Sequence, residues 1–354
     1  MSLINSYAIW NNKGGVGKST ITFHLASRYA EKNPKHKVLV IDLCPQSNSS
    51  MMLLGGGSDG EQQVLRFCTE AAPRTVVGYL STVISGGSGA PLPPYSDFVV
   101  KAKDYNPRMP SNLHLLCGDG NLEPMSPAIS AAAAAPALTP TSKPWLWIHE
   151  IFKRLIEQIT ADDDKWLVLV DTNPSFSIYT ELALSAVESI ITPVNADDSS
   201  RVATSAMFIL LHGQNPPHPV YGSWTFANLA NVHGLNVPKI HLVVGNRLTQ
   251  YVGTAAAFKA LSDATADTLY QSFRAHPGYF TQRVGRILNI SQFRDEYSQS
   301  LRDFNTAGVV CAHLGMLLSQ MQQEYYEVHG TRVKVNKERI IECADAVDEV
   351  LAKL

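Results

Sequence analysis

The sequence lacks the marks of a membrane or secreted protein. It has no apolar run of about 18 residues, the length that a membrane-spanning helix needs, and Met1–Tyr7 has neither the basic nor the apolar region of a signal peptide. Its five cysteines are scattered and form no CxxC pair, so neither a disulfide framework nor a zinc site is predicted. We therefore expect a cytoplasmic protein that does not bind membranes.

Charge is also scarce. Charged residues make up 17% of the 354 residues and the formal net charge is −2 at pH 7. A global basic field is therefore excluded, and any surface for nucleic acid must be local. Apolar residues make up 45%, which excludes disorder of the whole chain. The length is sufficient for one large α/β domain or two ordinary ones.

Apolar runs typical of strands alternate with patterns typical of helices. The predicted strands are apolar throughout, as in a parallel sheet buried on both faces, and are Tyr7–Trp10, Val38–Asp42, Trp166–Asp171, Ser189–Val194 and Lys239–Val244. The helices expected between them are Ser19–Lys32, Trp145–Ile159, Ile178–Val187, Arg201–Leu211 and Thr254–Phe273. This alternation predicts an α/β fold: a doubly wound, mostly parallel sheet with helices on both faces and a ligand at the carboxyl ends of its strands.

Residues 55–143 depart from this alternation, although we expect residues 1–354 to form a single domain. The segment is rich in Gly, Ser, Pro and Ala, which predicts an insertion made mainly of loops. Within it we expect a helix around Thr75–Ile84 and a strand at Leu113–Cys117. The alanine run Ser130–Ala135 fits a short helix and a flexible tether equally well.

Residues 290–354 are expected to form a helical extension. The predicted helices cover Gln292–Phe304, Ala307–Val328 and the end of the chain from about Lys337. The last helix carries acidic residues on its polar face, which anionic lipid would repel. We therefore expect it to pack on the body of the protein or at a dimer contact.

The strongest motif is the run KGGVGKST between the first expected strand and the first expected helix. Its glycines let successive backbone amides point at phosphate oxygens, and the helix N-terminus adds partial positive charge. Lys18 would reach the β- and γ-phosphates, and the Ser19 hydroxyl would hold Mg²⁺. A strict GxxxxGK[ST] pattern has glycine where this chain has Asn12. The run predicts a nucleotide site made by Lys13, Gly14, Gly15, Val16, Gly17, Lys18, Ser19 and Thr20.

With its extra lysine ahead of the glycines, this run resembles the deviant Walker A motif of the ParA/MinD superfamily. Members of that superfamily are P-loop ATPases that sandwich two ATP molecules in a dimer. Further stretches are similar to the family's motifs and follow in the family's order: VLVIDLCPQSN (Val38–Asn48), LVLVDTNPSFS (Leu167–Ser177), IITPVNADDSS (Ile190–Ser200) and VVGNRL (Val243–Leu248). The resemblance covers about residues 5–50 and 110–275, and the PQSN tail is closer to the ParA (partition) branch than to MinD.

This resemblance implies roles for individual residues, with ATP and Mg²⁺ as cofactors. Lys13 would reach the partner subunit's nucleotide, and with Lys18 and Asp42 it would make up the catalytic set. Asp42 and Asp171, each at the end of a predicted strand, would act on Mg²⁺ together with Ser19. At the adenine the resemblance places Asn246 and Arg247, although an asparagine at a strand end is equally often a turn residue.

One position breaks the family pattern. The second aspartate of the motif IDLDPQ, which positions or activates the attacking water, is Cys44 here. A neutral thiol is a weak acceptor, and losing a water-positioning group slows phosphoryl transfer by orders of magnitude. We therefore favour slow hydrolysis, and the alternative is that Asp42 or a residue of a partner holds the water. Asn173 replaces a proline of the next motif, so the conformation of that segment is open as well.

Three functions are compatible with these motifs. The favoured one is a ParA-like switch that dimerises around ATP–Mg²⁺ and engages DNA, a companion protein or both, as partition and positioning proteins do. The second is an ATP-loaded regulatory module with almost no turnover, read by a companion protein, which Cys44 favours. The third is a biosynthetic P-loop enzyme of the dethiobiotin-synthetase or amidoligase kind, against which Lys13 and the PQSN tail argue. Whether the chain is an enzyme with appreciable ATPase activity stays open.

The resemblance also implies a region for DNA binding. ParA-type dimers usually bind DNA without sequence preference, through basic residues near the C-terminal helices. Acidic residues lie between the arginines of that region, so a phosphate-binding track and an ordinary solvated face are both compatible with them. The arginines are Arg274, Arg283, Arg286, Arg294 and Arg302.

Overall fold

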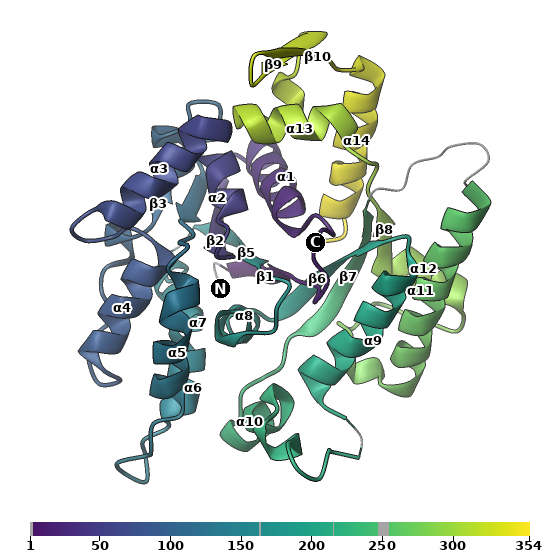
Figure 1. The fold of residues 1–354 in the computed structure, drawn as a ribbon. Coiled ribbons are helices and arrows are strands. Elements are labelled where there is room, and N and C mark those ends of the chain that lie inside the picture. The colour runs from purple at the N-terminus through teal and green to yellow at the C-terminus, as the bar shows by residue number, and fades with distance from the viewer. Residues whose placement is uncertain (1–2, 163, 215, 247–254) are drawn as a thin grey trace.

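An eight-stranded sheet forms the centre of the computed structural model, which describes residues 3–162, 164–214, 216–246 and 255–354 (Figure 1). Its strand order is β3-β4-β2-β5-β1-β6-β7-β8, and neighbouring strands are parallel except β3 and β4. The doubly wound, mostly parallel sheet is thus confirmed. The strands are β1 (Leu3–Ile9), β2 (His36–Leu43), β3 (Val100–Lys101), β4 (Leu113–Leu116), β5 (Lys165–Thr172), β6 (Ser189–Asn195), β7 (Lys239–Asn246) and β8 (Ser298–Ser300).

Helices cover both faces of this sheet. One face carries α1 (Lys18–Lys32), α2 (Asn48–Leu53), α3 (Gly57–Thr69), α13 (Asn305–Leu314) and α14 (Lys337–Leu351). The other carries α4 (Val76–Gly86), α5 (Leu122–Ala133), α6 (Pro144–His149), α7 (Ile151–Ile159), α8 (Ile178–Ser185), α9 (Asp198–His212), α10 (Phe226–His233), α11 (Ala255–Ala275) and α12 (Ile290–Tyr297). A hairpin of β9 (Tyr325–Val328) and β10 (Thr331–Lys334) lies outside the main sheet.

The continuous apolar strands follow from this double cover. In β2, Val38 and Val40 pack into the core under α1, whereas Leu39 and Ile41 pack into the core on the opposite face. Both sets are fully buried, so every position of the strand needs an apolar side chain. The five predicted strands correspond to β1, β2, β5, β6 and β7. The predicted helices correspond to α1, α8, α9 and α11, and Trp145–Ile159 is divided into α6 and α7 at Glu150.

The expectation of mainly loops over residues 55–143 is wrong. The segment contains α3, α4, α5, β3 and β4, and β4 pairs with β2 in the main sheet. Several of its glycines serve close packing: a Cβ on Gly60 would clash with the Met51 carbonyl, and one on Gly78 with the Pro73 carbonyl. The alanine run contributes the last turn of α5, where Ala133 is buried. The helix around Thr75–Ile84 and the strand at Leu113–Cys117 are confirmed as α4 and β4.

The C-terminal part is less helical than expected. The predicted helix Ala307–Val328 is wrong beyond Leu314, because Gly315 ends α13 at φ 53° and the chain continues into the β9–β10 hairpin. The predicted helix Gln292–Phe304 ends at Tyr297, where β8 adds a short strand beside β7. Its sequence, Ser-Gln-Ser, carries no apolar signal for a strand.

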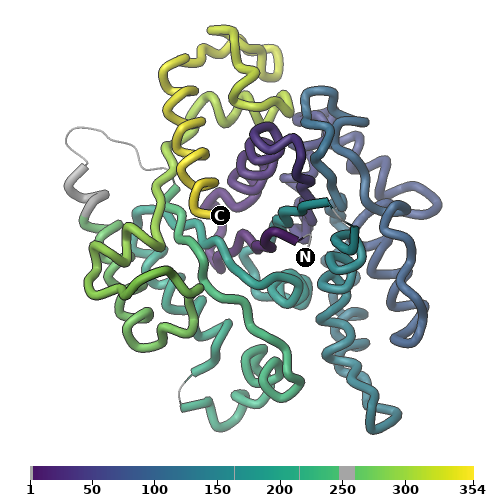
Figure 2. Tube along the Cα trace, turned by 180° about the vertical axis from the view of Figure 1, so that it is seen from behind, coloured from purple at the N-terminus to yellow at the C-terminus, as the bar shows by residue number. Residues whose placement is uncertain are grey.

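The last helix packs on the body of the protein, one of the two expected placements. In both views α14 runs beside α1 (Figures 1 and 2), and its Arg28–Asp348 ion pair joins the two helices. The carbonyl oxygen of Leu354 accepts hydrogen bonds from the side chains of Asn5 and Tyr7. Within the described ranges, no helix combines the length and apolarity needed to cross a membrane.

Asn106 joins the 55–143 segment to α2 and α13, which gives a first prediction. Its buried side-chain amide donates to the carbonyl oxygens of Leu53, at 3.2 Å, and of Gly315, at 2.7 Å. We expect Asn106→Ala to lower the free energy of unfolding by about 1–3 kcal/mol, since two buried carbonyls lose their donor. Urea unfolding measures this loss. Asn231→Ala, at an exposed position on α10, is the control, and equal losses in both variants would contradict the linking role.

Candidate nucleotide-binding site

The loop between β1 and α1 has a backbone that only glycine adopts easily at two positions. Gly15 has φ 71° and Gly17 has φ 85°, both in the left-handed region. A Cβ on Gly17 would also clash with the side-chain amide of Asn246, which donates to the Val16 carbonyl oxygen at 2.8 Å. The carboxyl end of β7 therefore touches the loop, so that the predicted nucleotide residue Asn246 lies beside it. Arg247 lies outside the described residues.

Lys18 is folded back along this loop. Its Nζ donates to the carbonyl oxygens of Asn11, at 3.2 Å, and Lys13, at 2.9 Å, and the residue is only 7% exposed. Burial lowers the pKa of Lys18 to about 8, although the charge of Asp171 opposes this shift. An anion bound at the loop would stabilise the charged form of Lys18, and the buried ammonium would in turn attract the anion.

Asp42 and Asp171 lie directly opposite each other at the carboxyl ends of β2 and β5. Both are fully buried, and burial raises the pKa of both carboxyls; the nearby Asp42 charge raises that of Asp171 further. Asp42 accepts hydrogen bonds from the backbone N–H of Cys44 and from the N–H and hydroxyl of Ser50, at 2.7–3.1 Å. Asp42 thus fixes the turn between β2 and α2.

The second oxygen of Asp171, Oδ2, is buried and has no hydrogen-bond partner in the part of the chain that the structure describes. Burying an unsatisfied carboxylate oxygen is costly, so this atom is suited to a bound water or cation. The described residues contain no cluster of three or more His, Cys, Asp or Glu side chains that could form a complete metal cage. The donors therefore fit Mg²⁺, which keeps several waters and takes phosphate oxygens as further ligands.

Cys44 lies beside these two carboxylates as a neutral thiol. Burial raises its pKa to about 12, with the charges of Asp42 and Asp171 adding to the shift. At neutral pH the thiol therefore keeps its proton, and its weak acceptor sulfur replaces a carboxylate. This supports the prediction that Cys44 cannot hold an attacking water as the aspartate of the resembled motif does.

The loop and Cys44 line one cavity of about 710 Å³. The phosphate-loop side of this cavity is formed by Gly14, Gly15, Gly17, Lys18, Ser19 and Thr20. The C-terminal elements form another side, with His313 from α13 and His329 from the β9–β10 turn, whose rings lie 4.5 Å apart. Neither histidine is predicted from the sequence, because no motif connects them with a loop about 300 residues earlier.

Lys13, predicted to reach a partner subunit, is bound within its own chain. Its Nζ forms an ion pair with Asp197 and donates to the Ser200 hydroxyl at 3.2 Å. Asp197 also caps α9 by accepting from the Ser200 N–H at 2.7 Å. Burial raises the pKa of Asp197, but hydrogen bonds from Lys13, Ser199 and Ser200 outweigh it and hold this pKa at about 2. The carboxylate therefore stays charged over the whole physiological range.

The five arginines predicted to contact DNA fall into two groups, three that already have partners within the chain and two that are exposed. Arg294 pairs with Asp263 at 2.7 Å, and Arg302 approaches Glu342 at 4.0 Å. Arg283 donates to the His241 carbonyl oxygen and lies over the Tyr297 ring. The remaining two, Arg274 and Arg286, are exposed and form no ion pair within the described ranges.

A glycine-rich phosphate loop at the carboxyl ends of a parallel sheet defines a P-loop nucleotide-binding protein. A family model described as an AAA domain matches residues 4–210, more than half of the chain. The chain therefore belongs to this family, within the ParA/MinD superfamily of P-loop ATPases, and the resemblance seen in its motifs is confirmed.

Solved structures with a similar fold span almost the whole chain. A variant of Cyanothece McdA in complex with ATP is 15% identical, with a TM-score of 0.58 over 99% of this chain and 98% of that one. The pnob8 ParA is 15% identical, with a TM-score of 0.55 over 99% and 96%. A protein assigned to plasmid partition from Borrelia burgdorferi, bound to AMPPNP, is 14% identical, with a TM-score of 0.51 over 99% and 98%. At these identities the likeness shows the fold alone. Among curated protein sequences, no match was found.

Two loop glycines give a matched test of the site. We expect Gly17→Ala to weaken binding of a fluorescent ATP analogue at least about tenfold, because both the left-handed backbone and the Asn246 contact exclude a Cβ. Gly14→Ala should stay within about threefold of wild type, since its added Cβ would meet only Pro174, at 4.0 Å. Equal binding by all three proteins would show that the nucleotide does not contact this loop.

Proposed function

We propose that this chain is a ParA-like switch that binds ATP–Mg²⁺, dimerises around it, and in that state engages a companion protein, DNA or both. The observation that carries the proposal is the single cavity that the phosphate loop shares with Cys44. Two similar structures, of a McdA variant and of a partition protein, hold ATP and AMPPNP, which supports ATP as the nucleotide here. Because Cys44 is a neutral thiol, hydrolysis would be slow and the bound state long-lived.

Three residues would hold Mg²⁺ when the nucleotide binds. The Ser19 hydroxyl lines the cavity, Asp171 offers an unpartnered buried oxygen, and Asp42 lies directly opposite Asp171. When bound, the ion would neutralise charge on the phosphate oxygens. The chain's own part is to place Lys18 and the loop amides against those oxygens and to keep the carboxylates out of bulk water.

Dimerisation would require Lys13 to change partner. Lys13 cannot reach the nucleotide of a second subunit while Asp197 and Ser200 hold it. The ion pair with Asp197 is partly exposed, so water and salt weaken it. For DNA contact we propose Arg274 and Arg286, the two arginines of the region that remain exposed and unpaired within the described ranges.

A second candidate function, an ATP-loaded module with almost no turnover, is favoured by Cys44 alone. The two candidates differ in whether hydrolysis resets the dimer. In the second, release of the companion protein would follow nucleotide exchange. The Cys44 variants below separate them.

We expect Cys44→Asp to raise the rate of ATP hydrolysis at least about tenfold, because a carboxylate would accept the hydrogen bond of the attacking water. Cys44→Ser, which stays neutral, should remain near wild type, and Lys18→Ala gives the background. Phosphate release is measured with and without plasmid DNA. Because Cys44→Asp adds a third carboxylate beside Asp42 and Asp171, its thermal stability is compared with and without Mg–ATP.

Wild-type turnover that is well above the Lys18→Ala background and equal to that of Cys44→Asp would contradict slow hydrolysis. Another group would then position the water. His313 and His329, in the same cavity, would be the next residues to substitute. Turnover of Cys44→Asp that stays at the wild-type level, with both near background, would favour the nearly non-hydrolytic module.

Freeing Lys13 should favour the dimer. We expect Asp197→Asn to lower the dimer dissociation constant with AMPPNP by about two- to fivefold, the range that a partly exposed ion pair can supply. Asparagine caps a helix as well as aspartate does, so α9 should be unaffected. Analytical ultracentrifugation gives the constant, with Asp198→Asn, exposed in the same helical turn, as the charge control. A weaker dimer in Asp197→Asn would contradict the restraint.

A further inference from the structure

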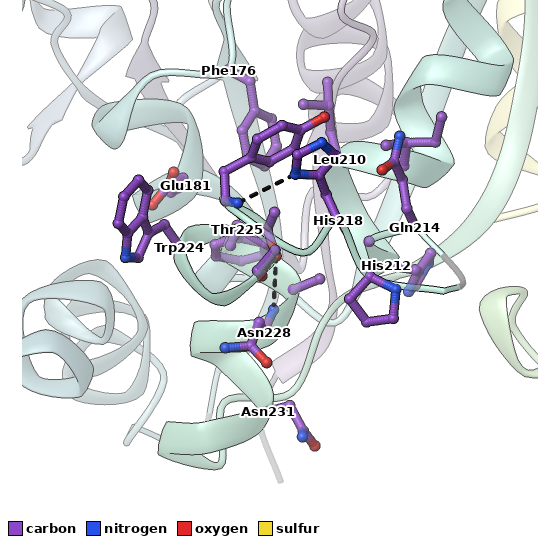
Figure 3. A pocket seen from close by; sticks show the side chains of 17 residues that line it. Phe176, Glu181, Leu210, His212, Gln214, His218, Trp224, Thr225, Asn228 and Asn231 are labelled. Carbon is purple, nitrogen blue, oxygen red and sulfur yellow. Dashed lines mark hydrogen bonds between the residues drawn. The ribbon is translucent and has the colours of Figure 1, made fainter.

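A second cavity, of about 530 Å³, lies between α8, the end of α9 and α10 (Figure 3). Four aromatic side chains line it: Phe176, Tyr221, Trp224 and Phe226. The nucleotide does not use this cavity, because none of its lining residues belongs to the phosphate loop or to the strand ends beside it. Of the described residues in its lining, only Phe176 falls within a motif quoted above, the stretch Leu167–Ser177.

Among the described residues that line the cavity, Glu181 is the only acidic one, and none is a lysine or an arginine. The lining residue His212 is neutral at physiological pH, because burial lowers its pKa to about 4. Behind the lining, the buried His149 lies 3.0 Å from Oε2 of Glu181 and orients the carboxylate. The other oxygen, Oε1, accepts no hydrogen bond from the residues that the structure describes, and is left for a ligand.

This combination suits a guanidinium group. A planar cation stacks on aromatic faces, and its N–H donors match a carboxylate held in place. A carboxylate repels anions, so the chemistry of the lining selects against phosphate and acidic peptides. The amides of Gln214 and Asn228 add neutral acceptors and donors at the wall.

The rim of the cavity indicates a protein rather than a free small molecule. Val220 is 69% exposed and Trp224 is 73% exposed, and both belong to the connection between α9 and α10. A ligand that fills only the cavity would leave these side chains in water, whereas a protein surface around an inserted side chain would cover them.

The two cavities are connected by one short segment after β5. Thr172 and Pro174 line the nucleotide cavity, and Phe176 lines the second cavity. The ring of Phe176 packs against Trp10, at the start of the phosphate loop, with ring centroids 5.5 Å apart. A side chain that displaces Phe176 would therefore act on residues at the phosphates.

We propose that this second cavity binds an arginine side chain of a partner protein, and that its occupancy is coupled to nucleotide binding through residues 172–176. The identity of the occupant as part of a companion protein rests on the proposed switch function. The presence of a cation site does not.

The first experiment tests the site with a blocked Gly-Arg-Gly peptide, titrated into the full chain and followed by NMR chemical shifts. The control peptide carries citrulline, which has the shape of arginine without its charge. We expect the arginine peptide to saturate within about 10 mM and the citrulline peptide to bind at least about tenfold more weakly. Equal binding of both peptides, or no shifts at 10 mM, would overturn the cation site.

Variants locate the binding. Glu181→Gln and Trp224→Ala should each weaken the arginine peptide at least about fivefold. Glu188→Gln, an exposed carboxylate outside the cavity, should not change it. Because Glu181→Gln also alters the His149 contact, its unfolding curve is compared with wild type, and Trp224→Ala tests the site without touching that contact. Unchanged affinity in Trp224→Ala would overturn the assignment.

The second experiment tests the coupling. The affinity for a fluorescent ATP analogue is measured with and without saturating arginine peptide, and we expect at least about a twofold change, with the same factor for the reverse effect. An unchanged ATP affinity would overturn the coupling and leave the cation site standing. Peptide binding by a wild-type protein that binds no ATP would instead refute the proposed switch and preserve the site.

Discussion

Two buried carboxylates beside a buried lysine are the constraint on which the rest of this structure depends. Asp42 and Asp171 are placed side by side by the register of β2 and β5, and Lys18 by the turn that starts α1. Burial raises the pKa of both carboxyls, and the charge of Asp42 raises that of Asp171 further, so keeping both groups charged in the core opposes folding. Such a cluster is stable only where backbone amides, hydroxyls and, in function, phosphates and a cation can compensate it.

The surrounding fold keeps this cluster dry and defines what can approach it. Ser50 and the backbone of the β2–α2 turn satisfy Asp42, while Asn246 ties the carboxyl end of β7 to the phosphate loop. The C-terminal elements then complete the cavity from the far side, with His313 and His329 in its wall. A thiol at position 44 fits this setting, because it adds no third negative charge beside Asp42 and Asp171.

Much of the site could be predicted because its signals are local. The glycines, Lys18 and Ser19 are consecutive, and the strands before Asp42 and Asp171 are recognisable as continuous apolar runs. The loops predicted for the 55–143 segment are wrong for a physical reason: glycines such as Gly60 and Gly78 are there for close packing, and composition does not separate a packed glycine from a flexible one. The end of α13 at Gly315 and the strand β8 were not predicted either. The β8 residues Ser-Gln-Ser are all polar, and a single glycine does not by itself mark the end of a helix.

The sequence by itself determined the class of fold, the phosphate loop and the loss of a carboxylate at Cys44, because each depends on residues that are neighbours in the chain. Only the tertiary structure decided that Lys13 is held by Asp197, 184 positions away, and that three of five arginines are already engaged. It also decided that Phe176 connects two cavities. These features are contacts between distant segments, and their geometry exists only once the sheet has brought the segments together.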